Sequence, residues 1–140
     1  MDITKIPFND FIKIKKAEKE GHILEIQDKP QYLNHLGTVH ASAQFALAEA
    51  TSGQYLLEVF KEYAEGGIIP VVRAVETKYK KPAKGDIYSN ASMSEEDIEK
   101  VRGYLRVKGR AILEVAVQVR DSEEEVTMVS KFTWFIQVIN

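Results

Sequence analysis

One carboxylate lies in the most apolar stretch of the chain. Glu49 belongs to residues 41–50, ASAQFALAEA, whose other polar members are Ser42 and Gln44. Burying an unpaired carboxylate is costly, so the group must reach a polar partner or a cleft, or have a raised pKa. A carboxylate in an apolar cleft is typical of a general base or a nucleophile. A solvated edge, or a buried hydrogen bond to a neighbouring subunit, would explain Glu49 equally well, and the sequence leaves these alternatives open.

His40 is the second candidate, at or near the start of a predicted helix. Free backbone N–H groups point outward at a helix start, and the helix dipole favours negative charge there. The N–H groups of Ala41 and Ser42 are therefore candidates to receive a developing oxyanion. A packing or capping role for His40 is the alternative.

Nine residues separate His40 from Glu49. In one helix this spacing gives about 13.5 Å of rise and about 900° of rotation, so the two side chains point to opposite sides. They cannot act on one substrate atom within one chain. Either one of them is not catalytic, or the site joins His40 of one subunit to Glu49 of another, which requires at least a dimer. Gly53, one turn beyond Glu49, is expected to let another backbone approach closely.

Residues 38–63 form the longest helical segment that the pattern predicts, with Thr38 or a neighbour as its cap. Residues 41–50 are apolar on nearly every face, which is typical of a buried helix. Gly66 and Gly67 are expected to end it.

Alternating apolar and polar residues predict antiparallel strands in the rest of the chain. Residues 11–28 are interpreted as a hairpin, ended by Pro30, and a capping-box-like sequence at 94–97 starts a short helix to about Tyr104. Further strands are expected at residues 71–79, 87–93, 111–119 and 126–138. The fold class is α+β: five or six antiparallel strands in a curved sheet around one long central helix.

Length and composition limit the possible functions. The 140 residues, 44% of them hydrophobic, predict one domain over residues 1–140. A net charge of −2 gives no electrostatic case for nucleic acid, and the lack of cysteine excludes disulfides and thiolate chemistry. No stretch approaches the roughly 20 apolar residues that span a bilayer, and the N-terminus does not look like a signal peptide. A cytoplasmic protein without membrane partner, metal or cofactor is expected.

Two motifs resemble a known family. The segment NHLGTVHASAQFALAE places Asn34, Gly37, His40 and Glu49 in the register of hotdog-fold acyl-CoA thioesterases, in particular the phenylacetate-type (4-hydroxybenzoyl-CoA thioesterase-like) branch. The downstream YKKPAKGD is similar to that family's turn of Tyr, Pro-Ala and Gly-Asp, and the closing strands match in order and length. The family's two glycines after the histidine are Ala41 and Ser42 here, and the acid is Glu rather than the commoner Asp.

The resemblance implies a hotdog fold and hydrolysis of acyl-CoA, or acyl-carrier, thioesters at a site between two subunits of a homodimer, or of a dimer of dimers. The thioester carbonyl would lie against the N–H of Ala41, with Ser42 beside it. Glu49 of the partner subunit would be the base or the nucleophile. Asn34 would position water or the carboxylate, and His40 would orient the thioester. The implied substrate-binding residues are Gly37, Ser42, Lys80, Lys81 and Lys84, the lysines facing the CoA phosphates.

Two other functions compete with this one. A hotdog domain can bind acyl-CoA without turning it over, and the methyl of Ala41 narrows the approach to its N–H. A hotdog hydratase would also use a histidine and an acid, but its Asp-x-Asn-x-x-His pattern is absent. Hydrolysis of an acyl-CoA panel that disappears in Glu49→Gln would separate the enzyme from the binding module.

Overall fold

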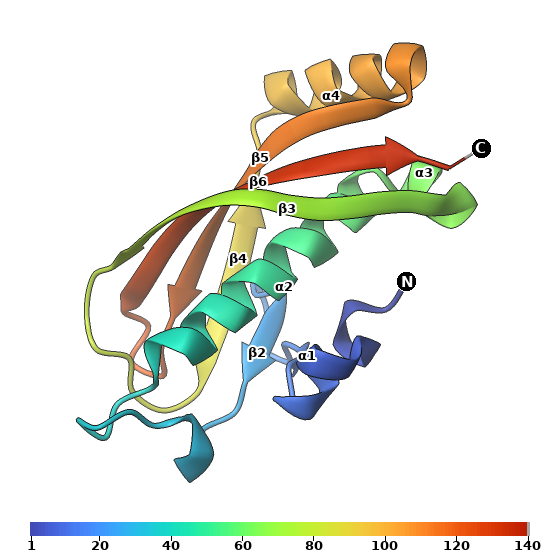
Figure 1. Cartoon of the computed structure of the whole chain (residues 1–140). Helices are drawn as coiled ribbons and strands as arrows, with labels where there is room; N and C mark the ends of the chain where they lie inside the picture. Colours follow the sequence, from blue (N-terminus) through green and yellow to red (C-terminus); the bar gives the residue numbers. More distant parts are fainter. Residues whose placement is uncertain (140) are drawn as a thin grey trace.

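A long helix, α2 (Ala41–Val59), lies in the concave face of a curved antiparallel sheet (Figure 1). The computed structural model describes residues 1–139, except the side chain of Glu65. The sheet has six strands in the order β1-β2-β4-β5-β6-β3. Their bounds are Lys15–Lys16 for β1, Leu24–Ile26 for β2, Ile68–Tyr79 for β3, Ile87–Ser92 for β4, Arg110–Arg120 for β5 and Val126–Val138 for β6.

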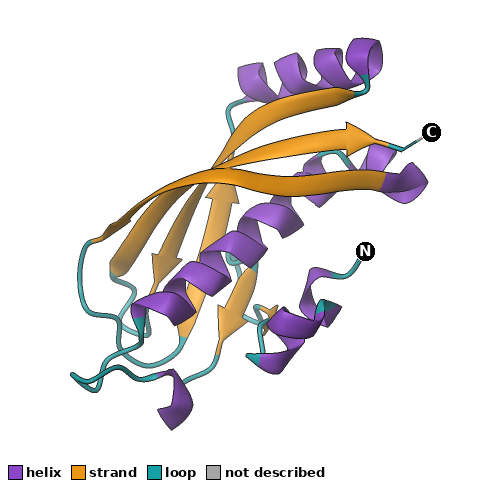
Figure 2. Ribbon diagram, in the orientation of Figure 1, coloured by secondary structure: helices purple, strands orange, loops and turns teal. Residues whose placement is uncertain are grey.

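The other helices are short or lie outside this centre (Figure 2). They are the 3₁₀ helices η1 (Ile3–Lys5) and η2 (Pro30–Tyr32), and the α-helices α1 (Pro7–Phe11), α3 (Lys61–Gly67) and α4 (Glu95–Lys108). The segment of η1 and α1 lies beside α2, whereas α4 lies along β5 (Figure 1).

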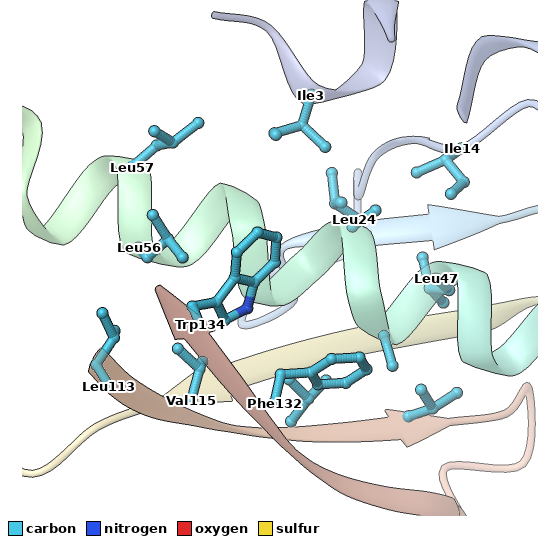
Figure 3. Close-up of a cluster of buried hydrophobic side chains, with 14 of the residues drawn as sticks. Ile3, Ile14, Leu24, Leu47, Leu56, Leu57, Leu113, Val115, Phe132 and Trp134 are labelled. Carbon is cyan, nitrogen blue, oxygen red and sulfur yellow. The ribbon is translucent and has the colours of Figure 1, made fainter. Parts of the chain in front are cut away.

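Much of the core lies between α2 and the strands β5 and β6 (Figure 3). Every second residue of β5 from Ala111 to Val119 is buried, which confirms the predicted inner face of that strand. On β6, Phe132 is fully buried, and the indole N–H of Trp134 donates to the Oγ of Ser52 on α2 at 3.0 Å. Phe132→Ala would cost about 3–5 kcal/mol by the usual range for a buried aromatic residue.

Buried polar pairs orient α2 against the sheet. The hydroxyl of Thr127 on β6 donates to the Oε1 of Gln44 at 2.7 Å. The hydroxyls of Thr51 on α2 and Ser89 on β4 are hydrogen-bonded to each other. These contacts fix which side of α2 faces the sheet, and breaking the first would leave the buried Oε1 of Gln44 unpaired. The opposite side of α2 is therefore free to form a site.

The central helix is shorter than predicted at both ends. It begins at Ala41 because His40, not Thr38, caps it: the Nδ1 of His40 accepts from the N–H of Ser42 at 2.9 Å. It is interrupted at Phe60, whose φ of −108° and ψ of 34° depart from helical values, and α3 continues as far as Gly67. The expected stop at the glycine pair is thus confirmed for α3.

The predicted hairpin at 11–28 is only partly correct. β1 and β2 pair antiparallel, but Phe11 ends the helix α1 instead of starting a strand. Pro7 occupies the first turn of α1, where its missing N–H is tolerated and its φ suits a helix. The short helix α4 begins as predicted, with the Oγ of Ser94 accepting from the N–H of Asp97, but extends to Lys108, where Gly109 takes a left-handed φ of 71°.

Candidate active site

Glu49 lines an apolar cavity of about 580 Å³ beside α2. The cavity lies between α2, the edge strand β3 and the N-terminal segment. Phe45 and Trp134 form part of its apolar wall, and Ile3 and Ile6 add a wall that sequence patterns did not predict. Glu49 is the only acidic residue among those that line it.

The carboxylate of Glu49 has no partner among the described residues. No hydrogen bond or ion pair within them reaches its side chain, and only its backbone carbonyl is engaged, by the hydroxyl of Ser52 at 2.7 Å. The group is half-buried, and this burial raises its pKa above the ordinary value because the charged form loses water without gaining a donor. A carboxylate in this setting is suited to accept a proton from water or to attack an acyl carbon.

His40 lies at the N-terminal end of α2, as its cap. Because its Nδ1 accepts a hydrogen bond from Ser42, the proton of the neutral ring is assigned to Nε2, which is left as a donor. The backbone N–H of His40 donates to the carbonyl of Tyr32 at 2.7 Å, which fixes the residue at the helix start. His40, Ser42 and Tyr32 line a second hollow of about 350 Å³.

The first turn of α2 leaves one N–H group open. The N–H of Ser42 is occupied by His40, and the N–H groups of Ala43 and Gln44 both donate to the carbonyl of His40. No acceptor among the described residues bonds to the N–H of Ala41. Of the two oxyanion donors that the sequence suggested, only Ala41 is therefore free, and Ser42 instead fixes the ring of His40.

Asn34 and Gly37 shape the loop that leads to His40. The Oδ1 of Asn34 accepts from the N–H groups of Leu36 at 2.9 Å and Thr38 at 3.1 Å, and its amide donates to the hydroxyl of Thr38 at 2.9 Å. Gly37 closes the turn at a φ of 75°, a conformation that L side chains rarely adopt. The polar atoms of Asn34 thus bond within their own loop.

The three candidate lysines of the β3–β4 turn are exposed and lie near the start of α2. The link is the carbonyl of Ala83, which accepts from the N–H of Val39 at 2.8 Å. Lys81 is paired with Glu125 at 3.0 Å, whereas no ion pair within the described residues includes Lys80 or Lys84. The phenol of Tyr79 donates to the carbonyl of Ala41 at 3.1 Å, so this turn also holds the helix start.

Gly53 does not serve the expected close approach of another backbone. It is buried, and the indole of Trp134 and the side chain of Ile3 fill the space beside it. A Cβ atom placed there would lie 3.5 Å from Trp134 and 3.6 Å from Ile3, which is ordinary contact. The prediction was wrong because it used α2 alone and did not include the N-terminal segment that packs over this face.

Within one chain the structure gathers the candidates into two groups. His40, Ala41 and Ser42 lie together at the helix start, above the loop of Asn34 and Gly37, and Glu49 faces a separate cavity. Tyr32 and the N-terminal wall of the Glu49 cavity were not predicted, because nothing in their spacing distinguishes them from ordinary core residues.

Residues 10–136 match a family described as "Domain of unknown function (DUF4442)". The chain belongs to this family. A search of the curated proteins found no match. Among the described residues, no helix has the length and apolar character needed to cross a membrane.

Solved structures share the fold of this DUF4442 member. A Pseudomonas aeruginosa protein described as "Probable Thioesterase" is 24% identical, with a TM-score of 0.78 over 98% of this chain and 91% of that one. A Haemophilus influenzae thioesterase is 15% identical, with a TM-score of 0.69 over 97% and 86%. A Bacillus halodurans protein crystallised with CoA is 17% identical, with a TM-score of 0.67 over 92% and 74%. The predicted hotdog fold is confirmed.

Proposed function

We propose that this DUF4442 protein is an acyl-CoA thioesterase whose site forms between two subunits. The observation that carries the proposal is the carboxylate of Glu49, half-buried in an apolar cavity without a partner among the described residues. The cavity would hold the acyl chain, and the carboxylate would meet the thioester at its mouth. The hotdog fold, shared with proteins described as thioesterases, supports this chemistry.

In the proposed reaction, Glu49 takes a proton from a water molecule whose oxygen attacks the thioester carbonyl. The oxyanion that develops on the carbonyl oxygen accepts the free N–H of Ala41, at the positive end of the α2 dipole. When the carbon–sulfur bond breaks, the proton held by Glu49 passes to the thiolate, leaving a free acid and CoA. Direct attack by the carboxylate through an anhydride, followed by hydrolysis, uses the same groups.

His40 would hold the thioester in place. The hydrogen bond from Ser42 to Nδ1 places the ring proton on Nε2, on the other side of the ring. The Nε2–H can therefore donate to the substrate without a change of tautomer. Asn34 and Gly37 would act through the loop that sets the position of His40. Lys80 and Lys84, together with Lys81 if its ion pair opens, are the candidates of the β3–β4 turn to meet the phosphates of CoA.

A site made from two chains follows from the separation of His40 and Glu49 on α2. The edge strand β3 supports a dimer, because it is twelve residues long, pairs with β6 on one side only and exposes about half of the side chains of Ile69 and Val71. A long apolar edge of this kind readily pairs with another strand. We propose a homodimer through this edge, able to pair into a dimer of dimers, in the cytoplasm.

The test measures the hydrolysis of a panel of acyl-CoA thioesters through the free thiol that is released. We expect steady turnover by the wild type and a loss of at least about 100-fold in Glu49→Gln, the lower range for removing a general base. Glu58→Gln makes the same chemical change at an exposed position of the same helix, so that variant serves as the control and should keep its activity. A wild type that binds acyl-CoA and never releases thiol would support the non-catalytic binding module instead.

A further inference from the structure

Four lysines line one hollow of about 300 Å³ in the N-terminal region. The hollow lies between η1, α1, β1 and the segment before η2, apart from the cavity of Glu49. Lys5 and Lys13 are exposed, whereas Lys15 and Lys29 are half-buried. Asp10 is the only acidic residue among those that line it.

The positive charge of this lysine hollow is poorly compensated. Lys15 is 3.9 Å from Glu18, and no ion pair within the described residues includes the other three lysines. The whole chain carries a net charge of −2, so the positive charge of the hollow is local and does not reflect a protein that is basic overall. Like charges around one concave site repel each other, and the repulsion is relieved when an anion enters.

Lys13 occupies a backbone position that favours glycine. Its φ is 60°, just after the end of α1, where the N–H of Lys13 donates to the carbonyl of Asp10 at 3.1 Å and that of Ile14 to the carbonyl of Asn9 at 3.0 Å. Glycine is the usual residue at this left-handed position after a helix, because a Cβ atom is strained there. Lys13 therefore lines the hollow although its left-handed backbone position would favour glycine.

Tyr32 connects the lysine hollow to the proposed active site. Its side chain lines both this hollow and the hollow that contains His40 and Ser42. The phenol donates to the carbonyl of Ile12, which fixes the ring between them. Tyr32 is thus a wall common to both hollows, and a long ligand with its thioester near His40 would run over this ring to reach the lysines.

We propose that the lysine hollow binds phosphate groups of CoA, at the end of the carrier that is remote from the thioester. The inference rests on the proposed function for the identity of the ligand, and on the charge and shape of the hollow for the phosphate. Lysine ammonium groups make charge-assisted hydrogen bonds with phosphate oxygens. We expect this hollow, and not the β3–β4 turn, to be the main phosphate contact, because its four lysines surround one concave site whereas the three lysines of the turn are exposed.

The test compares Lys13→Gly and Lys29→Ala with the control Lys16→Ala. Lys16 follows Lys15 in β1 but does not line the hollow. For each variant, kcat and KM are measured with an acyl-CoA and with the matching acyl-pantetheine, which has no phosphate. We expect KM for acyl-CoA to rise roughly tenfold in both hollow variants, with kcat and the acyl-pantetheine values unchanged. Lys13→Gly should melt no lower than the wild type, since glycine suits its backbone, so misfolding would not explain its effect.

Calorimetric titration with CoA separates this inference from the proposed function. If the protein hydrolyses nothing but binds CoA roughly tenfold more weakly in both hollow variants, the phosphate site stands and the enzyme proposal fails. If hydrolysis is normal and neither variant changes KM or CoA affinity, the site is wrong and the enzyme proposal stands. A rise in KM of equal size in Lys16→Ala also overturns the assignment to the phosphates of CoA. So does a rise in KM that the hollow variants show only when the acyl group is carried by an acyl carrier protein.

Discussion

The environment of Glu49 opposes its charge. Its carboxylate is half-buried beside Phe45 and Trp134, and no described donor compensates for the lost water. A group that serves only packing would gain by being apolar there, because an uncompensated polar group destabilises a fold. The same isolation gives a base of raised pKa next to an apolar cavity, which is useful for hydrolysis. Stability and function therefore make opposite demands on this residue.

The pH dependence of stability tests this conflict. Burial raises the pKa of Glu49 above its ordinary value of 4.5, so the folded chain holds this proton more tightly than the unfolded chain does. Below the unfolded-state pKa the carboxyl is protonated in both states, and its burial costs no charge desolvation. Stability is lost as the pH rises from there through the folded-state pKa, because the folded chain must then bury the charged form. We expect Glu49→Gln to melt at a higher temperature than the wild type at neutral pH, with the difference vanishing at acidic pH. Thermal denaturation across this range would contradict the account if the variant melts lower at neutral pH.

His40 has two roles that substitution can separate. Its Nδ1 caps α2, and its Nε2–H is the proposed contact with the thioester. His40→Ala should lose about 1 kcal/mol of stability together with activity. His40→Asn offers another capping oxygen, so we expect its stability to be close to that of the wild type while kcat/KM stays at least about tenfold low, the cost of one lost hydrogen bond. Thermal melting and steady-state kinetics measure both effects, and full activity in His40→Asn would leave His40 with the capping role alone.

At the scale of elements, the edge strand β3 is the feature that most affects assembly. Its outer side has no partner strand within the described residues, and Ile69 and Val71 of this strand have about half of their surface exposed. The cavity of Glu49 is bordered by Val71 and Val72 of the same strand. A second chain that pairs with β3 would thus also approach the carboxylate.

A charge on this edge should separate the subunits. We expect Val71→Lys to shift the protein to a monomer and to reduce turnover strongly, since edge lysines oppose strand pairing and a composite site needs two chains. Val107→Lys is the matched control, because Val107 is an exposed apolar residue on α4, far from β3 in sequence. Light scattering and activity are measured for both variants. A Val71→Lys monomer with undiminished activity would show that one chain contains the whole site.

Sequence patterns predicted the elements whose buried faces repeat. The alternation in β5 and β6 and the apolar surface of α2 gave their positions, because burial imposes a period of two or 3.6 residues. The short elements η1 and α1 have too few residues to show a period, and the place of η1 beside α2 depends on contacts with distant residues, such as that of Ile3 with Gly53. Glu49 was found because its charge conflicts with its neighbours. The use of the Ser42 N–H by His40 was not predictable, since it depends on the local backbone at the helix start.

At the scale of the whole molecule, the surface of α2 that faces away from the sheet organises the proposed chemistry. The His40 hollow lies toward its start, the Glu49 cavity lies further along, and the N-terminal segment borders both. The lysine hollow lies next to the first of these and shares Tyr32 with it. One subunit would then bind the carrier and the thioester, while its partner supplies the carboxylate.

Exchange of subunits between two variants of low activity tests this arrangement most directly. Glu49→Gln and His40→Asn are purified, mixed in equal amounts, exchanged through mild denaturation and assayed for acyl-CoA hydrolysis. Random pairing makes about half of the dimers mixed, and each mixed dimer regains one intact site of two, so we expect about a quarter of wild-type activity. If the mixture is no more active than the separate variants although mixed dimers are demonstrated, Glu49 and His40 do not act across two chains, and the composite site is wrong.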